Sequence, residues 1–240
     1  VLQCSESMAT FQVKHHQIIE SALTNFNADF LAENHILFGG GTRIALEIDE
    51  YRESVDIDFL CPTRESYRAV RQQVTNASLG ALVLNEFKYA REIQADRYAV
   101  RTVIIVQDTK IKLEFVSFNE YQLTTESNPL FPVPSLSKES CFVTKLLANA
   151  DRATIYPFKD IYDLLAMCHA WGEIPPQAWH IAESFYADDV ARKLVMALEH
   201  ITANQKEHVK AAQAMLMKPE WFEIVQAQAT TLLHSMKANP

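Results

Sequence analysis

The sequence predicts an α+β protein, in which a mixed β-sheet flanked by helices precedes an all-α helical bundle. Apolar and polar residues alternate with the period of a strand in Val55–Leu60, and strand-sized runs recur within Leu84–Ser117. A segment with three prolines, residues 128–134, ends this pattern, and apolar residues then recur at helical spacing. We therefore expect an α/β domain over residues 1–127, an extended crossing segment over 128–134 and a helical domain over 135–240.

The expected α/β domain begins with Met8–Ala32, whose apolar residues recur at near-helical spacing and predict one helix. His35–Phe38 predicts a short strand that ends in three consecutive glycines, and Thr42–Asp49 predicts the helix that follows. The pattern then predicts a helix at Arg64–Val74, strands at Val55–Leu60, Leu84–Glu92, Tyr98–Gln107 and Lys110–Ser117, and a tight hairpin at Asp108-Thr109.

The helical domain is expected to contribute side chains to a cleft against the sheet. Its predicted helices are Lys138–Arg152, Phe158–Trp171, Pro176–Tyr186, Asp188–Thr202, Gln205–Met217 and Glu220–Lys237.

The composition limits the class of protein. The chain has 240 residues, of which 48% are hydrophobic, and a net charge of -8, which excludes extended disorder and a general positive field for nucleic acid. No run of about 20 apolar residues predicts a membrane span. Four widely spaced cysteines and the lack of a secretory pattern favour a cytoplasmic protein with reduced thiols. The stretch Arg64–Lys112 is locally basic, with nine Lys/Arg against five Asp/Glu, although solvated surfaces have the same composition.

Asp56 and Asp58 are the first candidate site residues. Positions i and i+2 of a strand lie on the same face, so the two carboxylates are expected side by side. Their repulsion is relieved by a divalent metal, and Mg²⁺ typically takes one or two carboxylates together with substrate phosphates. An ordinary half-exposed strand shows the same alternation.

Gly39, Gly40 and Gly41 are three of only five glycines in the chain. They lie between a predicted strand and a predicted helix, where backbone N–H groups and the helix dipole can bind phosphate, and the hydroxyl of Thr42 could join them. The G-K-[ST] element of a Walker loop is missing. A tight turn without a ligand would also explain the glycines.

Glu114 is a third candidate carboxylate. It lies between Leu113 and Phe115 in a predicted strand, where an acid is costly unless it is paired. It is expected to be a metal ligand or the base that accepts a proton from an attacking hydroxyl. Asp108 could replace it, and an exposed position on an edge strand would also account for it.

Four motifs in order along the chain resemble those of one family. They are Gly40–Leu46, Arg52–Phe59, Thr144–Arg152 and Lys159–Leu164. Together they resemble the AbiEii-type nucleotidyltransferases, toxins of type IV toxin–antitoxin and abortive-infection systems within the DNA polymerase beta-like nucleotidyltransferase superfamily. The resemblance implies a nucleotidyltransferase-type sheet in the first domain.

The resemblance also implies roles for individual residues. Gly40, Gly41 and Thr42 would hold a triphosphate, Asp56 and Asp58 would bind Mg²⁺, and Lys145 and Asp160 would be needed for nucleotide transfer.

Helical spacing gives the last two motifs a physical basis. Lys145, Asn149 and Arg152 share one helix face, and two cations there could contact phosphate oxygens. Asp160 and Asp163 also share a face and could orient Lys145 or a nucleotide sugar. Ser54, like Arg52, could steer phosphates beside the metal strand or cap a turn.

The resulting hypothesis is a Mg²⁺-dependent nucleotidyltransferase that transfers a nucleotidyl group from an NTP to an acceptor. By analogy with the family, the acceptor is expected to be RNA, for example a tRNA end, bound at the basic stretch, and a separate antitoxin would counteract the toxin. A small hydroxylated molecule or a protein could be the acceptor instead. A non-catalytic module that senses nucleotide is a third possibility, disfavoured because Asp56, Asp58, Lys145 and Asp160 are all present.

Overall fold

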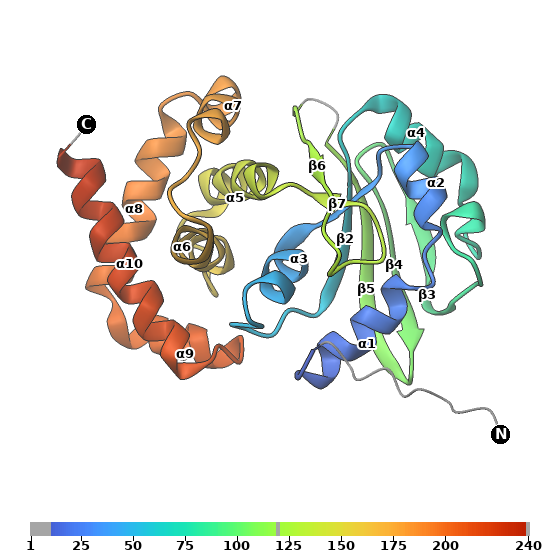
Figure 1. The fold of residues 1–240 in the computed structure, drawn as a ribbon, viewed down its shortest axis with the longest axis horizontal. Coiled ribbons are helices and arrows are strands. Elements are labelled where there is room, and N and C mark those ends of the chain that lie inside the picture. Colours follow the sequence, from blue (N-terminus) through green and yellow to red (C-terminus); the bar gives the residue numbers. More distant parts are fainter. Residues whose placement is uncertain (1–10, 119–120, 239–240) are drawn as a thin grey trace.

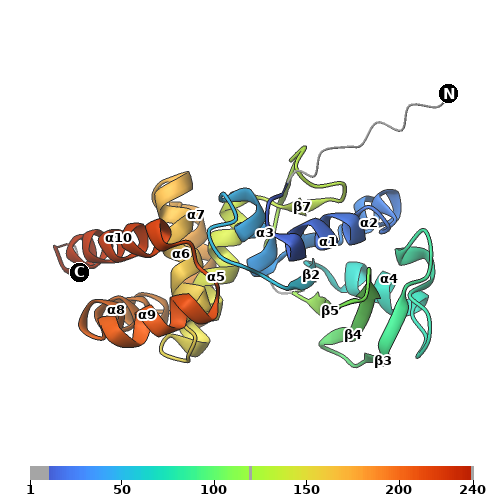
Figure 2. The same ribbon diagram turned by 90° about the horizontal axis from the view of Figure 1, so that it is seen from below.

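A computed structural model describes residues 11–118 and 121–238. The sheet and three N-terminal helices form one side of the molecule, and helices α5 to α10 form the other (Figure 1). Helix α3 (Gly40–Glu47) lies between the two sides and contacts both (Figure 2). The predicted α+β class is confirmed.

Within residues 11–118 and 121–238, seven strands form one mixed sheet in the order β3-β4-β5-β2-β1-β7-β6. Strands β2 and β5 run parallel at its centre, whereas β1 is antiparallel to β2. The strands are β1 Leu37–Gly39, β2 Asp56–Cys61, β3 Lys88–Ala95, β4 Ala99–Val106, β5 Thr109–Ser117, β6 Thr125–Glu126 and β7 Ser135–Leu136.

The predicted helix Met8–Ala32 is wrong as a single element. Its first three residues lie outside the described part of the chain, and the rest forms α1 (Lys14–Leu23) and α2 (Ala28–Glu33). The chain leaves the helix because Asn27 caps α2 by accepting a hydrogen bond from the Phe30 N–H, while its own N–H donates to the Leu82 carbonyl.

Helix α4 (Arg64–Gln73) starts at the predicted residue, and its Thr63 cap accepts a hydrogen bond from the Ser66 N–H. Strand β3 starts at Lys88 instead of Leu84, because Leu84 and Asn85 bond to Asn25 in the turn after α1. A 3₁₀ turn, Gly80–Leu82, precedes this segment.

The C-terminal helices follow the predicted pattern closely, and α5 and α7 have the predicted bounds. The six helices are α5 Lys138–Arg152, α6 Lys159–Trp171, α7 Pro176–Tyr186, α8 Asp189–Ala203, α9 Gln205–Ala214 and α10 Pro219–Ala238. None of the helices in the described residues is long and apolar enough to cross a membrane.

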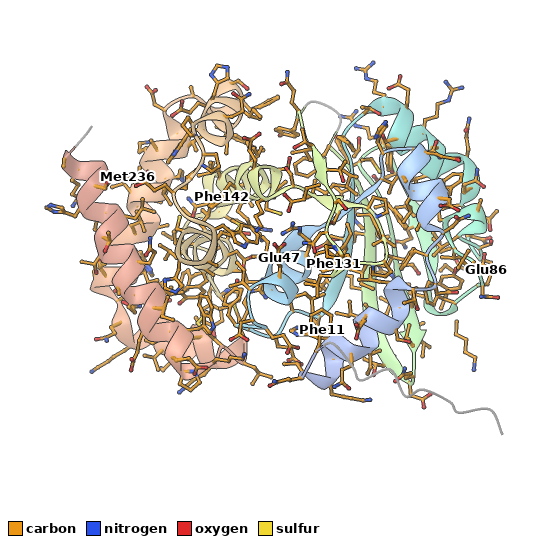
Figure 3. The ribbon with its side chains drawn as sticks, in the orientation of Figure 1. Phe11, Glu47, Glu86, Phe131, Phe142 and Met236 are labelled. Atoms are coloured by element: carbon orange, nitrogen blue, oxygen red, sulfur yellow. The ribbon has the colours of Figure 1, made fainter. Side chains whose placement is uncertain are left out.

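Two hydrophobic cores lie on opposite faces of the sheet. One is shared with the C-terminal helices and includes Phe142, whereas the other lies under α1, α2 and α4 and includes Phe11 and Phe131 (Figure 3). Strand β2 serves both, because Leu60 packs into the first core and Phe59 into the second. Asp56 and Asp58, four and two residues before Leu60, therefore face the C-terminal helices.

Candidate active site

A cavity of about 300 Å³ lies between the carboxylate-bearing face of the sheet and the helices α5 and α6. Its walls come from α3 and the segment before β2, from β2 and β5, and from the end of α5 through the start of α6. It is lined by Gly41, Arg52, Ser54, Asp56, Asp58, Lys112, Glu114, Lys145, Arg152, Ile155, Tyr156, Pro157, Lys159 and Asp160. Most of the predicted site residues are thus brought together.

The sheet side of the cavity is acidic. In the parallel register of β2 and β5, Asp56 lies opposite Lys112 and Asp58 lies opposite Glu114. The pKa of Asp58 is raised to about 6, mainly by burial and then by the charges of Asp56 and Glu114, against the opposing effect of Lys112 and Lys145. The pair Asp56 and Asp58 therefore fits a hard divalent cation, whose charge would relieve this repulsion.

Glu114 lies where the sequence predicted a third carboxylate, but it is already ion-paired. Its Oε1 accepts from Arg101 Nε at 3.0 Å and its Oε2 accepts from Lys112 Nζ at 2.7 Å. No group of three His, Cys, Asp or Glu side chains in the described residues has the geometry of a metal site. Asp108, the alternative, lies in the β4–β5 turn and does not line the cavity.

The three glycines meet three different requirements. Gly40 has a φ of +70°, and a Cβ there would lie 2.2 Å from Asp58 Oδ2. A Cβ on Gly41 would lie 2.3 Å from Arg52 Nη2, and one on Gly39 would collide with Leu60. Close approach of the α3 backbone to Asp58 and Arg52 thus explains Gly40 and Gly41, and close packing of β1 on Leu60 explains Gly39. Of the three only Gly41 lines the cavity.

Thr42 has a different environment from the predicted phosphate contact. It is buried, and its Oγ1 donates to the Asp56 carbonyl at 2.5 Å and lies 2.9 Å from Ser54 Oγ. The hydroxyl therefore joins α3 to the start of β2 instead of facing the cavity. Ser54 does line the cavity, and its N–H donates to His16 Nε2.

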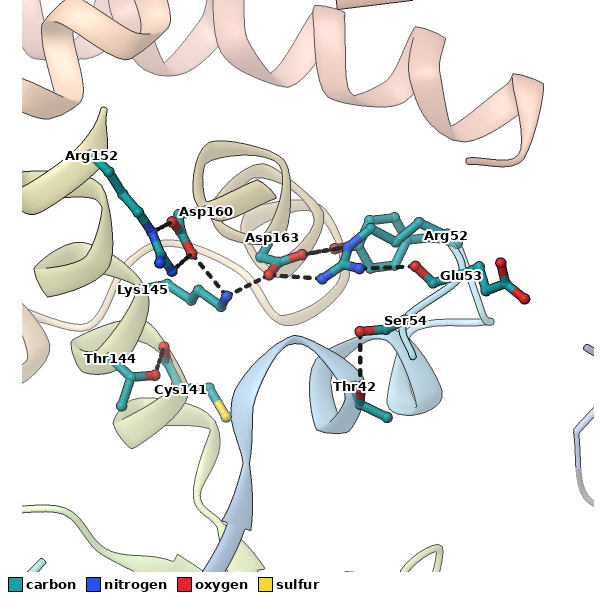
Figure 4. Close-up of polar contacts among 11 residues, drawn as sticks. Thr42, Arg52, Glu53, Ser54, Cys141, Thr144, Lys145, Arg152, Asp160 and Asp163 are labelled. Carbon is teal, nitrogen blue, oxygen red and sulfur yellow. Dashed lines mark hydrogen bonds and ion pairs between the residues drawn. The ribbon is translucent and has the colours of Figure 1, made fainter. Parts of the chain in front are cut away.

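The helical side of the cavity carries a ladder of ion pairs, which are buried except at Arg152 (Figure 4). Lys145 Nζ lies 3.0 Å from Asp160 Oδ1 and 2.6 Å from Asp163 Oδ2. Arg152 donates to Asp160 from Nε at 2.5 Å and from Nη2 at 3.2 Å. At the opposite end of this series from Arg152, Arg52 donates two hydrogen bonds to Asp163.

The charges in this ladder stabilise one another. Burial opposes ionisation of Asp160 and Asp163, yet Lys145 and the neighbouring arginines hold the pKa of both carboxyls below the ordinary value. Burial would lower the pKa of Lys145, but the two aspartates raise it instead. All of these groups are therefore charged at neutral pH.

Asp163 lies behind the cavity wall. Its side chain is fully buried and accepts hydrogen bonds from Tyr51 and Arg52 as well as contacting Lys145. Of the two roles that the sequence left open, orienting Lys145 fits this position, whereas contact with a sugar does not. Asn149 shares the helix face of Lys145 but is buried, and neither of its amide atoms has a hydrogen-bond partner within the described structure.

Sequence reasoning missed several lining residues. Lys112 lies two residues before Glu114 on the same strand, so the period of two that indicated Asp56 and Asp58 could have indicated it as well. Ile155, Tyr156 and Pro157 lie in the loop between α5 and α6, and no periodic pattern marks such a position.

Two solved structures have a fold similar to that of this chain. JHP933 from Helicobacter pylori matches the fold with a TM-score of 0.54 and 14% identity, covering 95% of this chain and 96% of that chain. A proposed nucleotidyltransferase from H. pylori matches with a TM-score of 0.51 and 14% identity, covering 94% and 96%. No curated protein sequence matches the chain.

A family model, "Nucleotidyl transferase AbiEii toxin, Type IV TA system", matches residues 21–235, which include the whole cavity lining. The chain therefore belongs to the AbiEii family of nucleotidyltransferase toxins of type IV toxin–antitoxin systems.

Proposed function

We propose that this nucleotidyltransferase uses Mg²⁺ to transfer the nucleotidyl group of an NTP to a hydroxyl of RNA. The observation that carries the proposal is the division of charge across one cavity. Asp56 and Asp58 form one wall, and Lys145 and Arg152 reach it from the other. A triphosphate with a bound cation presents the complementary arrangement, with positive charge toward the aspartates and phosphate oxygens toward the cations.

Asp56 and Asp58 would hold the cation, which when bound neutralises phosphate charge and orients the reacting oxygens. Glu114 could join them as well, but a cation there would compete with Arg101 and Lys112 for its two oxygens. We therefore assign Glu114 the second rank among the carboxylates, as a ligand or proton acceptor that becomes available when substrate displaces Lys112.

Lys145 and Arg152 retain donors for phosphate. An ammonium has three protons, and Lys145 uses two of them on Asp160 and Asp163, which leaves one for the cavity. Arg152 keeps its Nη1 protons, and its side chain is 55% exposed. The backbone at Gly41, at the start of α3, adds the positive end of a helix dipole. Gly39, Gly40 and Thr42 would not contact the phosphate themselves, and their role would be to position the backbone that carries Gly41.

The proposed reaction forms one bond and breaks one. The acceptor hydroxyl oxygen attacks the α-phosphorus, the bond from that phosphorus to the bridging oxygen breaks, and pyrophosphate leaves. The hydroxyl proton passes to a carboxylate of the acidic wall or to water. The protein contributes positioning and charge stabilisation, as is general for transfer at phosphorus.

RNA is the acceptor that the surface charge favours. Arg101 lies opposite Glu114 across β4 and β5, on the cavity face of the sheet, and Lys112 lies beside it. Arg91 of β3 lies opposite Val103 and continues this face. Helix α4 instead packs into the core on the other face, so only part of the basic stretch can serve a single acceptor. We further propose a tRNA end as the acceptor and a separately encoded antitoxin as the partner.

The test is to incubate the protein with Mg²⁺, each α-³²P-labelled NTP in turn and total tRNA. Label on the RNA that disappears in an Asp56→Asn, Asp58→Asn double variant is the expected result. Label that persists in that variant would contradict the proposed site. Label that transfers only to a small hydroxylated molecule or to protein would assign a different acceptor to the same site.

A further inference from the structure

The cavity lining separates into a charged part and an apolar part. Its only large apolar members, Ile155, Tyr156 and Pro157, are consecutive and lie in the loop between α5 and α6. Every other side chain that lines the cavity is charged or a serine, and Gly41 has none. A nucleotide has the same division, because its phosphates are charged and its base has an apolar aromatic face.

Ile155 and Tyr156 are exposed although both are large and apolar. Their exposed fractions are 61% and 51%, among the highest for apolar side chains in the described residues. Exposure of two neighbouring apolar side chains at the rim of a polar cavity is costly in water unless a ligand covers them. They lie shortly after the end of the helix that carries Lys145 and Arg152, so a ligand whose phosphates contact those cations could reach them.

The Tyr156 ring is supported from behind. It meets the ring of Phe158 edge-on, with centroids 5.7 Å apart and an interplanar angle of 77°. Phe158 is buried and stacks on His208 with centroids 4.4 Å apart. This aromatic series holds the loop at the rim of the cavity while Tyr156 itself remains half exposed.

The size of the cavity is consistent with a ligand that extends beyond it. At about 300 Å³ it is at the lower limit of small-molecule sites, which span roughly 300–1,000 Å³. Phosphates and sugar would fill the charged part, which leaves a base to extend over the rim. Aromatic stacking suits a base because every base has a π-face.

We propose that Tyr156, with Ile155 beside it, is a stacking platform for a nucleobase of the reaction. This rests on the proposed function, and it adds the residue that holds the base end of a nucleotide. The base belongs either to the donor NTP or to the end of the acceptor RNA, and the two sources predict different kinetic effects. Stacking on an aromatic side chain discriminates weakly among bases, so the platform should accept more than one NTP or RNA end.

The experiment measures binding of each NTP and of inorganic triphosphate, with Ca²⁺ in place of Mg²⁺ to prevent turnover. Tyr156→Ala should weaken NTP binding by about five- to 150-fold and leave triphosphate binding unchanged, and Tyr156→Phe should behave as the wild type. Tyr98→Ala is the matched control, because Tyr98 is 58% exposed and does not line the cavity. A Tyr156→Trp variant should show fluorescence quenching with NTP but not with triphosphate.

The outcomes distinguish a base of the donor NTP from a base of the acceptor RNA. They also distinguish failure of the platform from failure of the proposed function. Unchanged NTP binding with a raised KM for RNA in Tyr156→Ala, restored in Tyr156→Phe, would assign the base to the acceptor and support the platform. Unchanged NTP binding and an unchanged KM for RNA would overturn the platform while leaving the proposed function intact. Failure of the wild type to bind either triphosphate or NTP would overturn both.

Discussion

Arg52 and Asp163, 111 residues apart in the chain, form a buried bidentate ion pair, with Nε 2.9 Å from Oδ1 and Nη2 3.1 Å from Oδ2. The pair joins the segment before β2 to helix α6, and Asp163 also contacts Lys145. It therefore fixes the distance between the acidic wall and the cationic wall of the cavity. Burial would lower the pKa of Arg52, but Asp163 and Tyr51 raise it, so the pair is charged.

Removing one partner of this pair should be strongly destabilising. Asp163→Asn leaves Arg52 and Lys145 without a buried counter-charge and should lower the free energy of unfolding by about 3–5 kcal/mol. The double variant Arg52→Met, Asp163→Leu should be less destabilised than the sum of the single variants Arg52→Met and Asp163→Leu. Urea denaturation of the wild type, these two single variants and the double variant measures the coupling, and additive effects would show that the pair does not act as a unit.

Thr42 gives a way to distinguish positioning from phosphate contact. Thr42→Val removes the buried hydroxyl that bonds to Asp56 and Ser54 and should lower the free energy of unfolding by about 1–3 kcal/mol. Thr42→Ser keeps the hydroxyl and should retain most of the stability. Thermal and chemical unfolding test this. A Thr42→Val protein with unchanged stability but weakened NTP binding would instead support the phosphate contact.

Gly40 and Gly172 provide a matched pair of glycines with positive φ. An alanine at either position is strained, at a cost of about 1–3 kcal/mol. Only Gly40→Ala also places a Cβ 2.2 Å from Asp58 Oδ2, whereas nothing lies within 4 Å of a Cβ on Gly172. Both variants should lose stability, but only Gly40→Ala should lose Mg²⁺-dependent NTP binding, by at least about tenfold. Equal binding by the two variants would contradict this account of the glycine.

His208 should make stability depend on pH. Burial, with a smaller effect of His200, lowers the pKa of His208 to about 4, and its ring nitrogens bond to Tyr162 and His200. In the unfolded chain His208 binds a proton below about pH 6.5, whereas in the native protein it does so only below about pH 4. Between these two values the unfolded state holds more protons than the native state, so the stability of the protein falls as pH falls.

His208→Leu should therefore reduce the loss of stability between pH 7 and 4.5, measured from guanidinium unfolding midpoints. Some loss should remain, because burial also lowers the pKa of His16. An unchanged pH dependence would show that His208 is not the responsible group.

The parts of the fold that the sequence predicted best are those with strong local signals. Helix α7 begins with proline at its first position and α5 follows a serine cap, so the predicted bounds of both agree with the structure. Strands β6 and β7 have only two residues each, and they are defined by their pairing, in which β7 pairs with β1 and β6 pairs with β7. No local preference can predict such strands.

The candidate site likewise contains features that local spacing predicts and features that depend on tertiary packing. The period of a strand placed Asp56 and Asp58 on one face, and helical spacing placed Lys145 with Arg152 and Asp160 with Asp163. The direction of the Thr42 hydroxyl depends on how α3 packs against the start of β2, which the spacing does not contain. The ion pairs of Glu114 likewise depend on the register of β4 and β5.

Asp58 is the residue at which stability and activity should oppose each other. Its half-buried carboxylate is repelled by Asp56 and Glu114, and the proposed cation relieves that repulsion. Asp58→Asn keeps the shape of the side chain without the charge. It should stabilise the metal-free protein by about 0.5–2 kcal/mol, or roughly 1–8 °C in Tm, while abolishing transfer. Asp108→Asn is the control, since it makes the same change at an exposed turn.

Thermal unfolding with and without Mg²⁺ tests this opposition. Mg²⁺ should raise the Tm of the wild type and of Asp108→Asn, because a ligand that binds only the native state stabilises it. It should leave the Tm of Asp58→Asn nearly unchanged, since half of the carboxylate pair is gone. Equal Mg²⁺ effects in all three proteins would place the cation elsewhere, and a lower Tm for metal-free Asp58→Asn would mean that the carboxylate supports the fold directly.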